Sequence, residues 1–453
     1  MTDSKAVIVY GAGISGRGAA EVLAKAGQQV FLYNDSPCTV EPALEQLLQA
    51  AEGALVCGGF EQLLPKAKQV VLSPGVWADN ANVLLAEQSG VEVISEIELA
   101  YRLYQGHLVG ITGTNGKTTT TTLVGQMLAC LPVKTGVGGN IGLAMSKEVA
   151  QLDEQSWFAA ELSSFQLEKV QSFAPDVAAV LNLTPDHLDR HRTLENYYGA
   201  KKRLLLQQSS DQVAVLNYDD PLVREWGREC PGRVCYFSRT QELEQGLFIR
   251  DGVFTLKWGK IETGICPVDE VHIFGGHNEE NVLAAIGCGF FAGVDLEDMA
   301  RVLRSFKAVE HRLEYVAEIS GVPYYNDSKA TNTDAAVKAL QAFKNGHVIL
   351  LAGGVDKLTE LETMMAVVKE KVDVLILLGA AKERFNQAAI AAGVKHIELV
   401  TSFEEAVELA HKLAKKPQVV LLSPACSSFD MFKNYPARGR RFKELVHQLE
   451  THA

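Results

Sequence analysis

The feature that most constrains this chain is a glycine-rich turn, GTNGKTT, between an apolar run and a helical pattern. The apolar run, His107–Thr112, is typical of a strand buried on both faces, and Lys117–Cys130 is typical of a helix. Glycines in such a turn let backbone N–H groups converge on an anion, and the helix presents the positive end of its dipole to the same anion. The turn therefore predicts a phosphate-binding loop in a parallel α/β sheet.

The loop departs from the general phosphate-loop pattern, because Ile111 stands where that pattern has a glycine. Lys117 can reach the outer phosphates, and the Thr118 hydroxyl can bind Mg²⁺. A helix-capping turn rich in threonine and glycine is the alternative interpretation. The position between a strand and a helix favours phosphate binding over that alternative.

A second glycine-rich turn, GAGISG at 11–16, follows the strand-like run Ala6–Tyr10, and Asp35 follows the next predicted strand, Gln29–Asn34. This is the dinucleotide-binding fingerprint, in which glycines allow the backbone to approach a pyrophosphate. Alone, it predicts binding of NAD or FAD. Two phosphate-binding turns in one chain, however, predict two phosphorylated ligands, one of them a nucleoside triphosphate.

Alternating apolar strands and helices predict an α/β fold with three domains. We expect an N-terminal Rossmann-like domain (1–95), a central P-loop ATPase-like domain with a parallel sheet (96–308) and a C-terminal Rossmann-like domain (309–453). The stretch Gly246–Pro267 alternates and has Asp-Gly and Trp-Gly turns, which predicts an antiparallel insertion in the central domain. Ser-Gly at 320–321 predicts a hairpin at the start of the third domain.

Composition excludes several classes of protein. The net charge of −12 argues against a general nucleic-acid binder, and no run of apolar residues is long enough for a membrane span. The polar start, MTDSK, has no basic region or cleavage site, which argues against a signal peptide. Eight scattered cysteines without a CxxC pair indicate reduced thiols. We therefore expect a cytoplasmic protein.

Three further groups are candidates to join the phosphate loop. Glu161 ends a strand-like run, and in a parallel sheet its carboxylate would lie beside the loop and could hold Mg²⁺. His187 and His191 have the i, i+4 spacing of zinc ligands, but Leu188 stands where HExxH has its glutamate, so we expect no zinc site. From the residues alone, a structural role for Glu161 and His187 stays open, and spacing does not make Lys201 catalytic.

Taken together, these motifs resemble the Mur ligase superfamily, and within it the branch that adds D-glutamate. GTNGKTT resembles the ATP loop of that family, while NLTPDHLDRH and GAKKRL resemble its metal and lysine motifs. GGHNEENVLAA is similar to its ATP-contact helix, and EHRLE and YYNDSKATN are similar to the start of its C-terminal domain. SPACSSFDMFKNYPARG is the string that best discriminates the branch. The resemblance covers nearly the whole chain.

The resemblance implies an ATP-dependent ligase that joins D-glutamate to the L-alanine carboxylate of UDP-N-acetylmuramoyl-L-alanine. The reaction would pass through an acyl phosphate, give ADP and phosphate, and serve peptidoglycan precursor synthesis. The resemblance also implies two Mg²⁺ ions, and we expect a monomer. Three alternatives stay open: another amino-acid ligase of the same family, an NAD-dependent oxidoreductase, and a non-catalytic nucleotide-binding protein.

The family's roles carry over to the matching positions of this sequence. The expected catalytic residues are Lys117, His187 and Lys201, with the Lys201 amine expected to be modified by CO₂ to an N6-carboxylate. The expected metal ligands are Thr118, Glu161, His187 and Lys201. The expected ATP contacts are Gly113, Thr114, Asn115, Gly116, Lys117, Thr118, Thr119, Asn278, Asn281, Arg312 and Asp327. The expected UDP-substrate contacts are Ile14, Ser15, Asp35, Ser36 and Asn140, and the expected D-glutamate contacts are Lys329, Thr331, Lys357, Ser428 and Tyr435.

Overall fold

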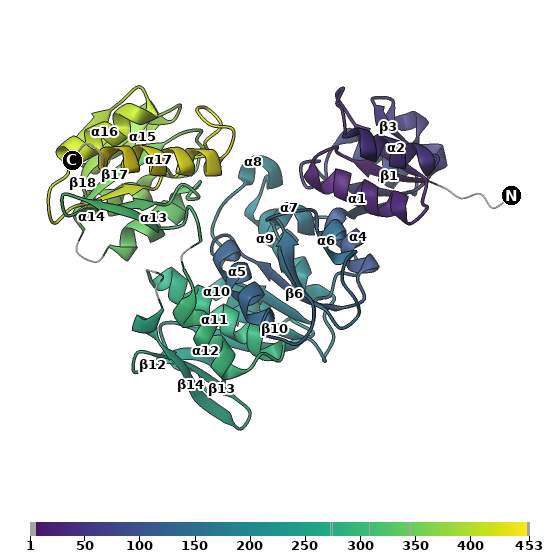
Figure 1. The fold of residues 1–453 in the computed structure, drawn as a ribbon, viewed down its shortest axis with the longest axis horizontal. Coiled ribbons are helices and arrows are strands. Elements are labelled where there is room, and N and C mark those ends of the chain that lie inside the picture. The colour runs from purple at the N-terminus through teal and green to yellow at the C-terminus, as the bar shows by residue number, and fades with distance from the viewer. Residues whose placement is uncertain (1–5, 272, 274, 308, 344–345, 451–453) are drawn as a thin grey trace. The chain divides into compact units, whose positions relative to one another are not determined.

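The computed structural model describes residues 6–271, 273, 275–307, 309–343 and 346–450. The first five residues, on which the expected absence of a signal peptide rests, lie outside this set. Three sheets occupy successive stretches of the chain, each with helices packed on it (Figure 1). By its internal contacts the chain divides into two units. One comprises Met1–Leu183, Arg190–Val271 and Glu280–Ser305, and the other comprises Thr184–Asp189, His272–Glu279 and Phe306–Ala453.

The first sheet is parallel throughout, with the strand order β3-β2-β1-β4-β5. Its strands are β1 (Ala6–Tyr10), β2 (Val30–Asn34), β3 (Ala54–Cys57), β4 (Ala67–Leu72) and β5 (Glu92–Ser95). Its helices are α1 (Ile14–Lys25), α2 (Pro42–Ala50), α3 (Ala81–Gln88) and α4 (Glu96–Leu103). All five residues of β1 are buried, as their apolar run predicts.

The second sheet has the order β14-β13-β12-β11-β10-β9-β6-β8-β7. Its parallel strands are β6 (His107–Thr112), β7 (Thr135–Gly139), β8 (Trp157–Glu161), β9 (Val177–Val180), β10 (Val213–Asn217), β11 (Arg233–Ser238) and β12 (Gly246–Arg250). The pairing of β12 with β13 (Val253–Trp258), and of β13 with β14 (Ile261–Pro267), is antiparallel. The predicted antiparallel insertion is therefore confirmed.

Helices α5 to α12 accompany the second sheet in sequence. They are α5 (Lys117–Leu128), α6 (Met145–Val149), α7 (Ser164–Leu167), α8 (Leu188–His191), α9 (Leu194–Leu206), α10 (Pro221–Trp226), α11 (Gly276–Phe291) and α12 (Leu296–Ser305). The strand β6 lies between β8 and β9, and α5 begins directly after the glycine-rich turn. The turn thus has the strand–loop–helix setting that the sequence predicts.

The third sheet has the order β15-β16-β20-β17-β18-β19. Its strands are β15 (Glu314–Ile319), β16 (Val322–Asn326), β17 (Val348–Gly353), β18 (Val372–Leu378), β19 (Ile397–Leu399) and β20 (Val419–Leu422). Its helices are α13 (Thr333–Ala342), α14 (Glu362–Lys371), α15 (Lys382–Ala392), α16 (Phe403–Leu413) and α17 (Tyr435–Glu450). Strands β15 and β16 form the predicted antiparallel hairpin, and the other pairings are parallel.

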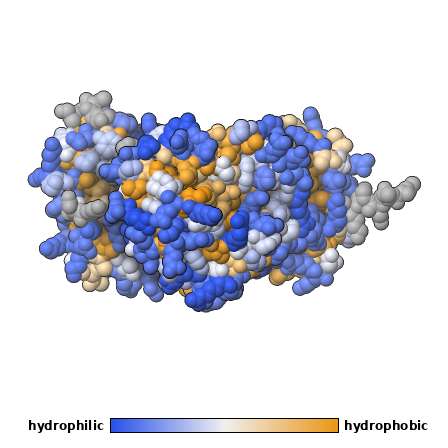
Figure 2. Space-filling model, turned by 90° about the horizontal axis from the view of Figure 1, so that it is seen from below, coloured by the Kyte–Doolittle hydropathy of each residue, from blue (hydrophilic) through white to orange (hydrophobic). Residues whose placement is uncertain are grey.

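The cores of all three sheets are mostly aliphatic, as a chain with only 8% aromatic residues predicts. Polar residues cover much of the face seen in Figure 2. Within the described residues, none of the helices combines the length and the apolar character needed to cross a membrane. The fold class predicted from the sequence is thus confirmed.

Candidate active site

The loop between β6 and α5 has a backbone that only glycine adopts readily. Gly113 has φ +153° and Gly116 has φ +85°. A Cβ placed on Gly116 would lie 2.1 Å from the Asn281 Oδ1 atom of α11. The expected ATP contact Asn281 is 3% exposed, and its Oδ1 atom also accepts a 3.4 Å hydrogen bond from Thr120. The loop and Asn281 therefore pack against each other with no room for a side chain.

Asn182, which follows β9, holds this loop in place. The amide of Thr114 donates to the Asn182 carbonyl (2.9 Å), and the amide of Asn115 donates to Asn182 Oδ1 (2.8 Å). In return, Asn182 Nδ2 donates to the Asn115 carbonyl (3.1 Å). Sequence reasoning missed this role, although Asn182 is the first residue of the NLTPDH motif that it singled out.

Two lysine ammonium groups converge on one carbonyl of the loop. Lys117 Nζ donates to the carbonyls of Gly113 (2.9 Å) and Thr114 (2.8 Å). Lys201 Nζ donates to the same Gly113 carbonyl (2.7 Å) and lies 4.8 Å from the centre of the Tyr197 ring. Lys201 is 1% exposed. The loop is therefore strongly cationic, which suits a polyanionic ligand.

The helix α9 decides which of two neighbouring lysines reaches the loop. Lys202, one residue on, lies about 100° further round the helix and pairs with Glu229 at 2.8 Å. Lys201 and not Lys202 thus points to the loop, which agrees with the residue expected from the family motif.

Glu161 lies beside the loop because β8 runs parallel to β6, with Glu161 opposite Ile111. Its carboxylate is 1% exposed and accepts a 2.8 Å hydrogen bond from Asn140 Nδ2. Thr118, in the first turn of α5, is 5% exposed. A carboxylate and a hydroxyl are the oxygen ligands that Mg²⁺ prefers, so the chemistry of these donors fits that ion.

The second glycine-rich turn, GAGISG at 11–16, also depends on close backbone packing. A Cβ on Gly16 would lie 1.8 Å from the Gly11 carbonyl oxygen. Asp35 accepts hydrogen bonds from the hydroxyls of Tyr10 (2.7 Å) and Tyr33 (3.1 Å). Burial, and then the hydrogen bond to Asp35, raise the pKa of Tyr10, which keeps its hydroxyl a donor. The other residues expected at this turn are exposed or half-buried: Ile14, Ser15 and Ser36.

Arg190, in α8, ties the segment after β4 to the second sheet. Its guanidinium donates to the carbonyls of Pro74 (2.6 Å) and Val76 (3.0 Å) and to Glu168 (2.8 Å). It also lies 4.1 Å from the centre of the Phe165 ring. This buried arginine therefore braces the segment beside the second glycine-rich turn, a role that the sequence does not reveal.

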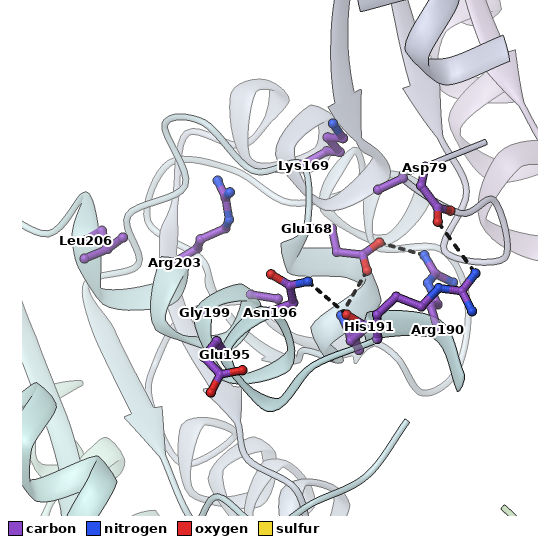
Figure 3. A pocket seen from close by; sticks show the side chains of 13 residues that line it. Asp79, Glu168, Lys169, Arg190, His191, Glu195, Asn196, Gly199, Arg203 and Leu206 are labelled. Carbon is purple, nitrogen blue, oxygen red and sulfur yellow. Dashed lines mark hydrogen bonds and ion pairs between the residues drawn. The ribbon is translucent and has the colours of Figure 1, made fainter. Parts of the chain in front are cut away.

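A pocket of about 530 Å³ lies beside Arg190, on the outer face of α9 (Figure 3). In Figure 3, Glu168 joins Arg190 and His191, and His191 Nε2 also contacts the Ser164 hydroxyl at 2.9 Å. His191 therefore belongs to a buried polar network. None of the expected ATP, metal or substrate contacts lines this pocket.

In the other unit, Asp186 binds two residues from the loops that follow strands of the third sheet, Lys357 and Asn332. It accepts hydrogen bonds from Lys357 Nζ (3.0 Å) and from Asn332 Nδ2 (2.9 Å), and it lies 3.6 Å from His187 Nε2. Burial alone would raise the pKa of Asp186, but the charges of Lys357 and His187 and its hydrogen bonds outweigh burial and bring the pKa to about 2. Asp186 is thus an anion that holds the expected D-glutamate contact Lys357.

Two expected D-glutamate contacts, Lys357 and Ser428, and the expected ATP contact Asp327 gather because β16, β20 and β17 are parallel neighbours. Asp327, Ser428 and Lys357 follow these strands, so they lie at the same edge of the sheet. Ser428 is 2% exposed, and among the described residues its hydroxyl has no hydrogen-bond partner; the same holds for the buried Nε of Arg312. Buried polar groups normally have a hydrogen-bond partner, and an anion is one ligand that would accept from both of these groups.

Two further groups set the electrostatics of this edge. Burial raises the pKa of Asp327 to about 7, against the lowering effect of its 2.8 Å hydrogen bond from Ser423 and of Arg312. Arg438 of α17 is 1% exposed and donates to the carbonyls of Ser328 (2.8 Å) and Cys426 (3.0 Å). Arg438 therefore fixes the loops after β16 and β20, which sequence reasoning did not foresee.

Four further expected contacts lie in this unit. Lys329 Nζ lies 5.4 Å from the centre of the Tyr435 ring, and Thr331 is half-buried. Asn278 is 9% exposed, and its amide donates to the Gly275 carbonyl (2.8 Å).

Comparisons with known proteins agree with these motifs. Three family models match the chain: the Mur ligase MurD-like N-terminal domain over 5–95, the Mur ligase middle domain over 111–289, and the Mur ligase glutamate ligase domain over 311–426. The UDP-N-acetylmuramoylalanine–D-glutamate ligase of Desulfitobacterium hafniense is 45% identical over 98% of this chain and 97% of its own. The chain belongs to the Mur ligase family.

Other relatives of this Mur ligase carry the same description. The UDP-N-acetylmuramoylalanine–D-glutamate ligase of Pelotomaculum thermopropionicum is 42% identical, and that of Lachnoclostridium phytofermentans is 41% identical, each over 98% of both chains. A pseudomurein peptide ligase type C from Methanothermus fervidus has a similar structure, with a TM-score of 0.61 and 18% identity over 98% of this chain and 100% of that one. The structure of UDP-N-acetylmuramate–alanine ligase from Thermotoga maritima is also similar, with a TM-score of 0.59 and 18% identity over 99% of this chain and 100% of that one.

Proposed function

We propose that this Mur ligase joins D-glutamate to the L-alanine carboxylate of UDP-N-acetylmuramoyl-L-alanine, at the expense of ATP, in peptidoglycan precursor synthesis. The observation that carries this proposal is the loop at 113–119 with Lys117 and Lys201 on one carbonyl, in a chain 45% identical to a ligase of that name. The family assignment decides against the oxidoreductase alternative, because the second glycine-rich turn then serves a UDP group.

The proposed reaction forms and breaks bonds only among the substrates, with no covalent bond to the protein. A substrate carboxylate oxygen forms a bond to the γ-phosphorus, and the bond from that phosphorus to the bridging oxygen of ADP breaks. The amine of D-glutamate then forms a bond to the activated carbonyl carbon, phosphate leaves, and the amine loses its proton. Phosphoryl transfer of this kind depends mainly on positioning and on neutralising charge.

The glycine-rich loop supplies the positioning in this proposal, and its Lys117 ammonium together with bound Mg²⁺ supplies the positive charge, because a carboxylated Lys201 is no longer a cation. The N–H groups of Gly113–Thr119 and the Lys117 ammonium would hold the triphosphate, with Asn281 fixing the loop from behind. Thr118 and Glu161 would hold one Mg²⁺, and His187 and a carboxylated Lys201 a second. Bound there, Mg²⁺ would neutralise the charge that builds up on the phosphate oxygens.

The amino-acid pocket is proposed at the strand ends of the third sheet. Lys357 and the Ser428 hydroxyl would bind the carboxylates of D-glutamate, and Asp186 would orient Lys357. The remaining proposed contacts of the amino acid are Lys329, Thr331 and Tyr435. In the same unit, the proposed ATP contacts are Asn278, Arg312 and Asp327. In the other unit, the proposed contacts of the UDP substrate are Ile14, Ser15, Asp35, Ser36 and Asn140. We also propose the domain ranges 1–95, 96–308 and 309–453, and a cytoplasmic monomer.

Phosphate release from ATP tests this proposal. UDP-N-acetylmuramoyl-L-alanine is supplied with D-glutamate, L-glutamate, L-alanine, L-lysine or diaminopimelate in separate reactions. Release with D-glutamate alone is expected. Release with another amino acid in place of D-glutamate would assign the chain to a different ligase of the family, and no release with any of them would overturn the proposal.

A further inference from the structure

Two cysteines lie side by side at the open edge of the first sheet. Cys57 is the last residue of the edge strand β3, and Cys38 lies four residues after the end of β2, the strand that pairs with β3. Their sulfur atoms are 3.9 Å apart. Both are free thiols, Cys57 exposed and Cys38 half-buried. The sulfur atoms of a disulfide are about 2.05 Å apart, so closure needs an approach of about 2 Å.

We propose that Cys38 and Cys57 form a reversible dithiol–disulfide site that reacts with low-molecular-weight disulfides. The pair differs from the other cysteines in its setting. Cys130, for example, is half-buried, and its sulfur contacts the carbonyl of Gln126 (3.6 Å) and the guanidinium of Arg301 (3.7 Å). A thiol oxidised there forms a mixed disulfide and stops, whereas a second thiol within reach completes the exchange.

The exchange balances in two steps. The exposed Cys57 thiolate attacks one sulfur of the small disulfide, forms a mixed disulfide and releases one small thiol. The Cys38 sulfur then attacks the Cys57 sulfur, the protein disulfide forms, and the second small thiol leaves. The protein loses two hydrogens and the small disulfide gains them. Burial and the hydrogen bond with Cys57 raise the pKa of Cys38, although the Arg17 charge partly opposes this. Because Cys38 is also less exposed than Cys57, we expect Cys57 to react first.

The disulfide would change the segment that carries two of the proposed UDP contacts, Asp35 and Ser36, so its effect on activity rests on the proposed function. Asp35 is held at one end of this segment by the Tyr10 hydroxyl (2.7 Å), and Asn34 Nδ2 holds the Ser36 carbonyl (2.8 Å). Closure would pull Cys38, two residues further on, towards β3. We expect the loss of about one hydrogen bond to the UDP substrate, which raises its KM about fivefold. The KM for ATP should not change.

Peptide mass spectrometry after treatment with oxidised glutathione tests the covalent step. Trypsin leaves both thiols in one peptide, 26–66, which contains no internal lysine or arginine and no third cysteine. Loss of two hydrogens from this peptide, resistance to alkylation and recovery with a reductant are expected. Cys57→Ser should leave Cys38 open to alkylation or carrying glutathione. Alkylation of both thiols in the treated wild type, or glutathione retained on either one, would overturn the proposal.

Kinetics of the oxidised and reduced protein test the consequence. Oxidation should raise the KM for UDP-N-acetylmuramoyl-L-alanine in the wild type but not in Cys57→Ser, and Cys130→Ser should respond like the wild type. An unchanged KM in the fully oxidised wild type would overturn the regulatory part. Absence of turnover even in the reduced protein would instead count against the proposed function, while the peptide masses would still decide whether the dithiol site exists.

Discussion

Gly116→Ala tests whether the loop after β6 needs the backbone and the packing seen in the structure. At φ +85° an alanine costs about 1–2 kcal/mol. Its Cβ would also lie 2.1 Å from Asn281 Oδ1, so the side chain or the loop must move by about 1.3 Å to reach an ordinary 3.4 Å contact. Misplacement of a binding group by about 1 Å lowers catalysis by about 100-fold. We therefore expect kcat/KM for ATP to fall about 100-fold.

Gly293→Ala is the matched control for this variant. Gly293 has φ +86°, and a Cβ there meets nothing within 4 Å. Gly293→Ala should lower the free energy of unfolding by the same 1–2 kcal/mol that backbone strain costs in Gly116→Ala. Its kcat/KM should change less than about twofold. The assays are phosphate release at varied ATP and thermal unfolding of both variants. If Gly116→Ala matched Gly293→Ala in kcat/KM, the close packing of Asn281 on the loop would have no part in ATP binding.

Three further predictions concern single side chains. Lys117→Ala should abolish phosphate release, because the loop loses the ammonium that is proposed to hold the triphosphate; substantial remaining turnover would remove this assignment. Lys201→Ala should be inactive and Lys202→Ala close to wild type, and CO₂-free buffer should reduce wild-type activity if Lys201 is carboxylated. Equal activity of the two variants would contradict that role. Asp327 has a pKa of about 7 when folded, so the unfolded chain ionises first and wild-type stability should fall as pH rises from about 4 to about 7. The free energy of unfolding of Asp327→Asn, measured with denaturant, should not show this fall. A fall as steep as that of the wild type would argue against the raised pKa of the buried Asp327 carboxyl.

The sequence predicts the elements that carry strong local patterns. The apolar run of β1, the turn between β6 and α5, the insertion β12–β14 and the hairpin β15–β16 are all found as predicted. The short edge strand β3 was missed because its residues are half-exposed and lack alternation. The strand β7, TGVGG, was missed because its three glycines favour a turn.

The residues of the candidate site also divide into those that a local sequence pattern marks and those that no local pattern marks. Lys117, Glu161 and Lys201 could be proposed from the sequence because a motif or a strand end marks each one, and in the structure all three lie beside the loop. Asn182, Asp186, Arg190 and Arg438 were not, because their partners are distant in sequence: Arg190 contacts Pro74, and Arg438 contacts Ser328. Such contacts depend on how distant segments of the chain pack in the fold, which local patterns do not specify.

The fate of one oxygen atom tests the proposed reaction. In the proposed reaction a carboxylate oxygen of UDP-N-acetylmuramoyl-L-alanine becomes bonded to the γ-phosphorus of ATP and leaves with phosphate. Substrate labelled with ¹⁸O in the alanine carboxylate, incubated with ATP and D-glutamate, should therefore give phosphate that carries one labelled oxygen, as measured by mass spectrometry or ³¹P NMR. Turnover that gives unlabelled phosphate would show that ATP does not activate this carboxylate and would contradict the account.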